Sequence, residues 1–155
     1  MCGIVGFFNT DFSMYADAEQ HLKVMNVLQK HRGPDGEGVW VHDRGHVGFG
    51  HVRLSIIDLD AGQQPMWAHD GSMITYNGEI YNYLELREEL SSGYDFHTTS
   101  DTEVILAAYQ KWGRECVQKL RGMFAFAIWD EPHQVLFCAR DRFGIKPFYY
   151  TQQGE

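Results

Sequence analysis

A short apolar run rich in β-forming residues, Gly3–Phe8, begins directly after Cys2 and ends at the polar residues 9–11. This pattern predicts a strand. Since chain termini otherwise tend to fray, a strand at this place would hold residue 2 inside the fold. Removal of Met1 would then leave Cys2 with a thiol and a free α-amine. Such an amine has a pKa of about 7.7–8.0, so it can act as a base for the thiol near neutral pH.

Helical periodicity is concentrated in the middle of the chain. It predicts a helix within residues 16–30, with its apolar residues facing the core, and helices over residues 82–90 and 104–112. Candidate capping boxes mark the starts of the last two, and a further helical stretch covers residues 114–120. The residues expected on the inner faces and at the caps are Leu22, Val24, Met25, Val27, Leu28, Tyr83, Leu86, Leu90, Asn82 with Glu85, and Ser100 with Glu103.

Strand patterns flank these helices. One strand is expected to end at Asn77-Gly78, a residue pair typical of a tight turn. Strands at both ends with helices between them predict an α+β fold rather than a βαβ repeat, and 155 residues fit one domain, residues 1–155. Besides the first run, the predicted strands cover residues 39–42, 47–53, 73–76, 123–129 and 134–139.

Composition limits the classes of partner. With 13 basic and 21 acidic residues the net charge is −8, which argues against nucleic acid as a partner. The chain has no apolar run near 18 residues and no secretory signal pattern, so we expect no membrane association and a cytoplasmic location. Three cysteines without a CxxC pair are expected to be free thiols, with Cys116 and Cys138 in the core.

Several common kinds of site lack sequence support. No HExxH, CxxC or EF-hand pattern accompanies the eight histidines, so we expect no metal site. Neither a phosphate-binding GxxxxGK[ST] loop nor a GxSxG elbow occurs. The glycine- and proline-rich residues 31–38 predict a loop, which either connects two elements or borders a site.

Four further residues have both a structural and a functional interpretation. Arg53, among apolar neighbours, is either an edge residue or a fork that binds a carboxylate. Asp101 is either favoured by the helix dipole alone or binds an ammonium group. Asn77 either forms a turn or joins the Gly78 N–H in an oxyanion hole. Together with Cys2, the functional interpretations describe a site that holds a zwitterionic amino acid and attacks an acyl group on its side chain.

Seven ordered stretches resemble the N-terminal glutaminase domain of class II glutamine amidotransferases, and RLSIID with the later SDTEV resembles the glutamine-hydrolysing asparagine synthetases. The resemblance implies an N-terminal nucleophile hydrolase fold, a four-layer αββα sandwich of antiparallel sheets. Because the chain stops after Tyr149-Tyr150-Thr151, the resemblance also suggests truncation at the C-terminus. The stretches are MCGIVGFF, HRGPDGEG, GHVRLSIIDLDAGQQPM, YNGEIYNYLELREEL, TTSDTEVILAAY, GMFAFAIWD and ARDRFGIKPFYY.

The resemblance implies hydrolysis of L-glutamine to glutamate and ammonia through a γ-glutamyl thioester on Cys2. Asn77 and the Gly78 N–H would stabilise the tetrahedral oxyanion as catalytic groups and would also contact the substrate. Arg53 would bind the substrate carboxylate, while Asp101 with Glu79 would orient its amino end. Backbone groups that would line the same pocket belong to Leu54, Ile56 and Ile57.

The resemblance also implies a second domain that this chain does not contain. The family joins this domain to a synthetase domain with an SGGxDS motif, which is absent here, and ATP and Mg would belong to that domain. The glutaminase reaction itself implies no cofactor and no metal. The ammonia acceptor and the oligomeric state stay open, and retention of Met1 would turn the Cys2 amine into an amide.

Two other classes of function fit parts of the pattern. A catalytically silent glutamine-binding or docking module would share the residues that bind the charged ends of glutamine, Arg53, Glu79 and Asp101, but would not hydrolyse it. An N-terminal nucleophile acylase or peptidase would share Cys2 but would need no pair of groups that bind the carboxylate and the ammonium of an amino acid.

Overall fold

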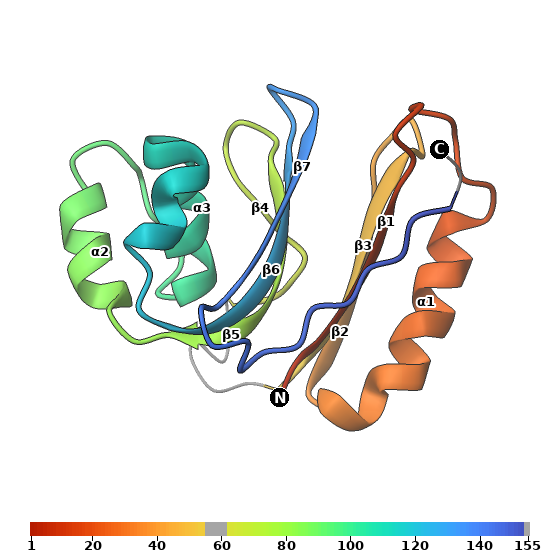
Figure 1. The fold of residues 1–155 in the computed structure, drawn as a ribbon, viewed down its shortest axis with the longest axis horizontal. Helices are drawn as coiled ribbons and strands as arrows, with labels where there is room; N and C mark the ends of the chain where they lie inside the picture. The colour runs from red at the N-terminus through yellow and green to blue at the C-terminus, as the bar shows by residue number, and fades with distance from the viewer. Residues whose placement is uncertain (55–61, 154–155) are drawn as a thin grey trace.

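The computed structural model of this protein describes residues 1–54 and 62–153. Two antiparallel sheets lie against each other, and helices cover their outer faces (Figure 1). From one side to the other the layers are helix α1, a three-stranded sheet, a four-stranded sheet, and helices α2 and α3. The predicted α+β class and the αββα layer order are both confirmed.

The three-stranded sheet consists of β1 (Gly3–Phe8), β2 (Gly36–Val41) and β3 (Val47–Arg53), in the order β1-β3-β2. The strand predicted directly after Cys2 is confirmed, and so is the hairpin of β2 and β3. Strand β3 is buried along its whole length because α1 packs on one of its faces and the second sheet on the other.

The four-stranded sheet has the order β4-β5-β6-β7. Its β6–β7 hairpin was predicted from sequence and is confirmed. The chain enters the helical layer after β5 and returns to the sheet at β6 (Figure 1). The strands are β4 (Met66–Trp67), β5 (Met73–Ile80), β6 (Gly122–Asp130) and β7 (Val135–Arg140).

The helical layer on this sheet contains α2 (Tyr83–Leu90) and α3 (Asp101–Trp112). Leu86 and Leu90 are buried in the core, and Tyr83 packs at its edge, as predicted. The residues after α3 form a 3-10 helix, η2 (Gly113–Gln118), rather than the predicted α-helical stretch over 114–120.

Two hydrophobic cores join three of the four layers. The larger one lies between the four-stranded sheet and helices α2 and α3, and includes Ile74, Ile105 and Phe126. The smaller one joins the two sheets through Phe49 of β3 and Trp129 of β6. Both faces of the four-stranded sheet are therefore covered by apolar contacts, whose burial stabilises the fold.

Helix α1 (Ala18–Gln29) packs against the three-stranded sheet through fewer residues than predicted. Its buried residues are Ala18, Leu22 and Asn26, spaced four apart. Asn26 donates a 2.9 Å hydrogen bond to the carbonyl of Gly38, and a Cβ placed on Gly50 would lie 2.6 Å from Asn26 Oδ1. The helix therefore lies so close to the sheet that few side chains fit between them. The predicted core positions that are instead exposed are Val24, Met25, Val27 and Leu28.

The predicted turn at Asn77-Gly78 is wrong, because β5 runs through both residues without a break. Gly78 pairs with Phe124 of β6, and a Cβ at Gly78 would lie 2.3 Å from the carbonyl oxygen of Met123. Glycine is therefore needed here for close approach of two strands, not for a left-handed turn.

One of the two predicted caps is confirmed. The Ser100 hydroxyl accepts a 3.1 Å hydrogen bond from the Thr102 amide at the start of α3, but Glu103 bonds to backbone amides that precede the helix and does not close a box. The cap predicted at Asn82 is wrong, since its side chain exchanges hydrogen bonds with the backbone of residues 119–121.

The three cysteines, all within the described residues, are free thiols as expected. Cys116 is buried, and burial raises the pKa of its thiol to about 12. Cys138 is exposed on the edge strand β7, so its predicted place in the core is wrong. Within the described ranges, each helix is too short or too polar to cross a membrane.

Candidate active site

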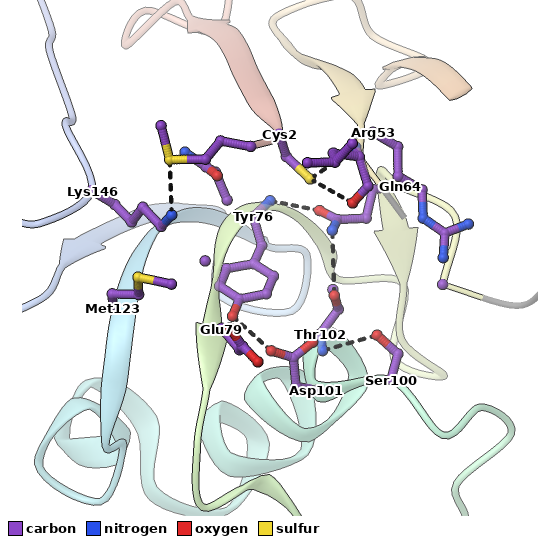
Figure 2. Close-up of a pocket in the computed structure, with 15 residues that line it drawn as sticks. Cys2, Arg53, Gln64, Tyr76, Glu79, Ser100, Asp101, Thr102, Met123 and Lys146 are labelled. Atoms are coloured by element: carbon purple, nitrogen blue, oxygen red, sulfur yellow. Dashed lines mark hydrogen bonds between the residues drawn. The ribbon is translucent and has the colours of Figure 1, made fainter. Parts of the chain in front are cut away.

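A cavity of about 120 Å³ opens where the start of β1, the end of β3, the middle of β5 and the first turn of α3 meet (Figure 2). It brings together most of the residues that the sequence singled out. Ile56 and Ile57, which were also expected there, lie outside the described residues. The predicted residues that line the cavity are Cys2, Arg53, Leu54, Asn77, Gly78, Glu79 and Asp101.

Strand pairing places Cys2 at one wall of the cavity. Gly3 pairs with Val52, so Cys2 lies beside the residues that follow β3. Its Sγ atom accepts a hydrogen bond of 3.4 Å from the Leu54 amide and lies 3.7 Å from the Leu54 carbonyl oxygen. The strand therefore fixes residue 2, as the sequence predicted.

The loop predicted over residues 31–38 is shorter in the structure, because η1 (Lys30–Arg32) and β2 take up its two ends. It contacts the site through the backbone of Cys2 and Arg53. Arg32 Nε donates a 3.1 Å hydrogen bond to the carbonyl oxygen of Cys2. The amide of Asp35 donates a 3.0 Å hydrogen bond to the Arg53 carbonyl, which joins the same loop to the end of β3. The sequence did not identify Arg32, although its place in a glycine-rich loop was the available signal.

Asp101 forms the floor of the cavity and is only 5% exposed. Its Oδ2 atom accepts hydrogen bonds from the Tyr76 hydroxyl at 2.7 Å and from the Ile80 amide at 3.0 Å. Burial raises the pKa of Asp101, and these two hydrogen bonds oppose that rise. Burial and the nearby Asp101 carboxylate raise the pKa of Tyr76 well above its usual value, so Tyr76 remains a neutral donor.

Gln64 ties two elements across the cavity and was not predicted as a site residue. Its Oε1 accepts a 2.6 Å hydrogen bond from the Tyr76 amide, and its Nε2 donates to the Thr102 hydroxyl at 3.3 Å. Gln64 belongs to one of the stretches that resemble the family, but its residue type and local pattern gave no signal for this role. In the structure, Gln64 fixes β5 relative to the first turn of α3.

The wall opposite Arg53 and Gln64 contains Met123 and Lys146 (Figure 2). Lys146 is 4% exposed, and its Nζ lies 3.2 Å from Sδ of Met1. The Met1 side chain thus lines the cavity beside Cys2. Lys146 belongs to a stretch that resembled the family, but no site role was assigned to it from the sequence.

The charges around the cavity are separated. Arg53, 9% exposed, stands at one side, while Glu79 and Asp101 lie toward the floor (Figure 2). Cys2 lies at the top of the same view. A cavity with a guanidinium, two carboxylates and a thiol has the groups needed to hold both charged ends of an amino acid beside a nucleophile.

Comparisons with known proteins identify the family of this chain. The family model described as a glutamine amidotransferase domain matches residues 1–155. Glutamine-hydrolyzing asparagine synthetase 1 of Bacillus subtilis (strain 168) is 56% identical over 154 residues, which cover 97% of this chain and 24% of that protein. Glutamine-hydrolyzing asparagine synthetase 3 of the same organism is 46% identical, with coverage of 99% and 25%. The chain spans about a quarter of the length of these curated relatives.

A solved structure supports the fold. Glutamine phosphoribosylpyrophosphate amidotransferase from B. subtilis aligns with a TM-score of 0.68 and 20% identity, over 91% of this chain and 37% of that one. This likeness and the layer order confirm the fold that the sequence predicted, a four-layer αββα sandwich of antiparallel sheets. From the family match over its whole length and from these relatives, the chain belongs to the glutamine amidotransferase domain family.

Proposed function

We propose that this domain hydrolyses L-glutamine to glutamate and ammonia with Cys2 as the nucleophile. The observation that carries the proposal is the shared cavity, in which the Cys2 thiol lies with the cationic Arg53 and the anionic Asp101. The other two free thiols do not lie in this cavity. Cys116 is buried in the core, and Cys138 lies on the edge strand β7. Relatives named as glutamine-hydrolysing enzymes support the same reaction.

Substrate binding in this proposal uses the separated charges. The Arg53 guanidinium binds the α-carboxylate of glutamine through two parallel hydrogen bonds. Asp101 and Glu79 bind the α-ammonium group, and Tyr76 holds Asp101 in place. The Leu54 backbone contributes to the same wall, and the expected contributions of residues 56–57 stay predictions. The side-chain carboxamide then extends toward the thiol.

The first half-reaction forms an acyl-enzyme. The α-amine of Cys2 accepts the thiol proton as Sγ bonds to the carboxamide carbon, and the carbonyl oxygen becomes an oxyanion. Asn77 and the Gly78 N–H donate hydrogen bonds to that oxyanion. The protonated amine then gives its proton to the leaving nitrogen, the C–N bond breaks, and ammonia departs from a γ-glutamyl thioester.

The second half-reaction restores the thiol. The neutral α-amine accepts a proton from water, the hydroxide attacks the thioester carbonyl, and the same oxyanion donors act again. Collapse of this intermediate breaks the C–S bond and releases glutamate, and the proton held by the amine returns to Cys2 Sγ. Thiol, amine and water account for every step, so the proposal needs no cofactor and no metal.

Removal of Met1 is a condition of this mechanism. While Met1 is attached, the nitrogen of Cys2 is an amide and cannot accept a proton. The Met1 side chain also lines the cavity that glutamine would enter. Processing would therefore supply the base and clear the site in one step.

We further propose that the ammonia serves an asparagine synthetase-type amidation in a synthetase domain outside this chain. The support is the identity of 56% to a B. subtilis protein of that name, of which this chain covers only 24%. ATP and Mg would act in that other domain. A reducing, cytoplasmic location suits a mechanism that depends on a free Cys2 thiol.

The test is release of glutamate and ammonia from glutamine by protein whose intact mass shows that Met1 is gone. Cys2→Ala should abolish release, and Cys138→Ala, which removes an exposed thiol outside the cavity, should keep it. Glutamine binding without any release would identify a silent binding module. Hydrolysis of acyl compounds that lack the zwitterion would identify an acylase or peptidase, and either result would overturn the proposal.

A further inference from the structure

Lys146 is a buried amine that the mechanism above does not use. It follows β7 in a turn built around Asp141, whose carboxylate accepts four backbone hydrogen bonds. This network fixes the backbone of Lys146 and directs its side chain into the cavity (Figure 2). The amides that donate to Asp141 belong to Phe124, Phe143, Ile145 and Lys146, at 3.2, 3.1, 2.9 and 2.9 Å.

The environment of this ammonium group is unusual. Lys146 is 4% exposed, and in the described part of the chain its Nζ has no carboxylate within 4 Å. Its hydrogen-bond acceptor is the thioether of Met1 at 3.2 Å, which is a weak acceptor. Burial of a charged group without a paired charge is costly, so this position calls for an explanation other than stability.

The contact with Met1 places Lys146 close to the future N-terminus. Met1 Sδ is separated from the nitrogen of Cys2 by the Met1 side chain and one peptide bond. Standard bond lengths therefore put Lys146 Nζ within about 10 Å of that nitrogen. Once Met1 is removed, the acceptor is lost and the ammonium faces the same cavity as the freed α-amine.

We propose that Lys146 is a positioning residue of the glutaminase site, whose charge keeps the freed α-amine of Cys2 in its neutral, proton-accepting form. The inference rests on the proposed function, in which that amine is the base. A second positive charge at the same cavity disfavours protonation of the amine by like-charge repulsion. More amine is then neutral at a given pH.

Other charged groups face the same amine. Arg32, bonded to the Cys2 carbonyl, acts in the same direction as Lys146, and so does Arg53. Glu79 and Asp101 act in the opposite direction, as does a Cys2 thiolate. When glutamine binds, its own charged ends pair with Arg53 and with the two carboxylates. Lys146 and Arg32 then remain as the cations without a substrate partner.

The pH profile of kcat/KM tests the proposal. Lys146→Met should move the midpoint of the acid limb upward by about one pH unit, as expected for a unit charge about 10 Å away at an effective dielectric constant near 20. Below the midpoint kcat/KM should fall about tenfold, while the high-pH plateau stays. Lys146→Arg should keep the wild-type midpoint. Lys23→Met, which removes an exposed charge on α1, is the matched control and should also keep it.

A titration without substrate separates this inference from the proposed function. In processed protein labelled with [15N]cysteine, the N-terminal amine resonance should titrate about one unit higher in Lys146→Met than in wild type. Lys146→Gln serves as the second variant if Lys146→Met does not fold. Equal amine midpoints in wild type and variant would overturn the inference even if glutamine is hydrolysed. Shifted midpoints in a protein that releases no glutamate would support Lys146 and reject the proposed function.

Discussion

The Tyr76 hydroxyl donates a 2.7 Å hydrogen bond to Oδ2 of Asp101, which joins strand β5 to the first turn of α3 at the floor of the cavity (Figure 2). Both residues are buried, at 3% and 5% exposure. The strand that carries Tyr76 continues directly into Asn77 and Gly78. This hydrogen bond therefore links Asp101, which is expected to bind the substrate ammonium, to the strand that carries the expected oxyanion donors Asn77 and Gly78.

Tyr76→Phe removes this donor and should weaken glutamine binding at low pH. Burial raises the pKa of Asp101 and the Tyr76 hydrogen bond opposes the rise, so its loss should raise that pKa further. Since the ionised carboxylate is the form that binds ammonium, KM should begin to increase at a higher pH than in wild type. The free energy of unfolding should fall by about 1.5–3 kcal/mol, as for a buried hydrogen bond to a charged group.

Tyr109→Phe is the matched control, because the Tyr109 hydroxyl donates a 2.9 Å hydrogen bond to Asp130 away from the cavity. It should cost a similar free energy of unfolding and leave the pH dependence of KM unchanged. Identical KM profiles for Tyr76→Phe and wild type would mean that Asp101 does not bind the substrate.

Arg53→Lys should raise KM for glutamine about 10- to 100-fold with little change in kcat. Lysine keeps the charge but loses the planar fork that binds a carboxylate through two hydrogen bonds. Steady-state kinetics of glutamate release measure both constants. Arg140→Lys, whose parent side chain bonds to the Gly144 carbonyl outside the cavity, should leave both unchanged. An unaltered KM in Arg53→Lys would leave Arg53 as a structural residue.

Asn77→Ala should lower kcat about 100- to 1000-fold, the usual cost of removing one oxyanion donor, with KM little affected. The same assay provides the measurement. Asn82→Ala removes an amide that bonds to the backbone of residues 119–121 on the surface, and its kcat should match wild type. A kcat for Asn77→Ala within a few fold of wild type would remove Asn77 from the oxyanion site.

His51 should make the fold less stable in acid. It is fully buried, its Nε2 lies 3.1 Å from the Tyr76 carbonyl, and burial lowers its pKa from 6.5 to about 4. A histidine with a lowered pKa stabilises the fold above pH 6.5, and this contribution is lost as the pH falls from 6.5 toward 4. Integrated over that window, the loss is about 3 kcal/mol. Burial also lowers the pKa of His46, which adds to the loss in the same direction.

Urea unfolding at a series of pH values checks this prediction. In His51→Gln the free energy of unfolding should depend less steeply on pH between 4 and 6.5, whatever its absolute value. His21→Gln, on the exposed face of α1, should keep the wild-type slope. Parallel curves for wild type and His51→Gln would show that His51 does not titrate as its burial implies.

Much of the fold follows from local sequence. Strand Gly3–Phe8 is predictable because a short apolar run rich in β-forming residues ends at polar ones, and the β6–β7 hairpin follows from two apolar runs around a turn. The Ser100 cap is predictable because a short side chain can reach the second amide of a helix without help from the rest of the fold.

Tertiary contacts decide the rest. Asn77-Gly78 is a turn pair by local preference, but β5 pairs with β6 along its whole length and continues through both residues. In α1, Asn26 occupies the close approach to Gly50, and the buried stripe of the helix leaves the predicted apolar positions Val24, Met25, Val27 and Leu28 exposed. Asn82 forms bonds to a segment almost forty residues further along, which no local pattern indicates.

The candidate site divides in the same way. Residue chemistry alone points to Cys2, Arg53, Asn77, Gly78 and Asp101. The family resemblance adds Glu79, and the fold brings all six to one cavity. The residues that hold them in place were missed, since Arg32, Gln64 and Tyr76 act through contacts between distant segments.

The most direct test of the central claim is intact-protein mass spectrometry after rapid acid quench of a mixture with glutamine. Protein that has lost Met1 should carry one γ-glutamyl group on Cys2 during turnover. Protein that keeps Met1, and processed Cys2→Ala, should carry none and should release no glutamate. A γ-glutamyl group on another residue, or turnover by protein that keeps Met1, would contradict a mechanism in which the freed α-amine of Cys2 activates its own thiol.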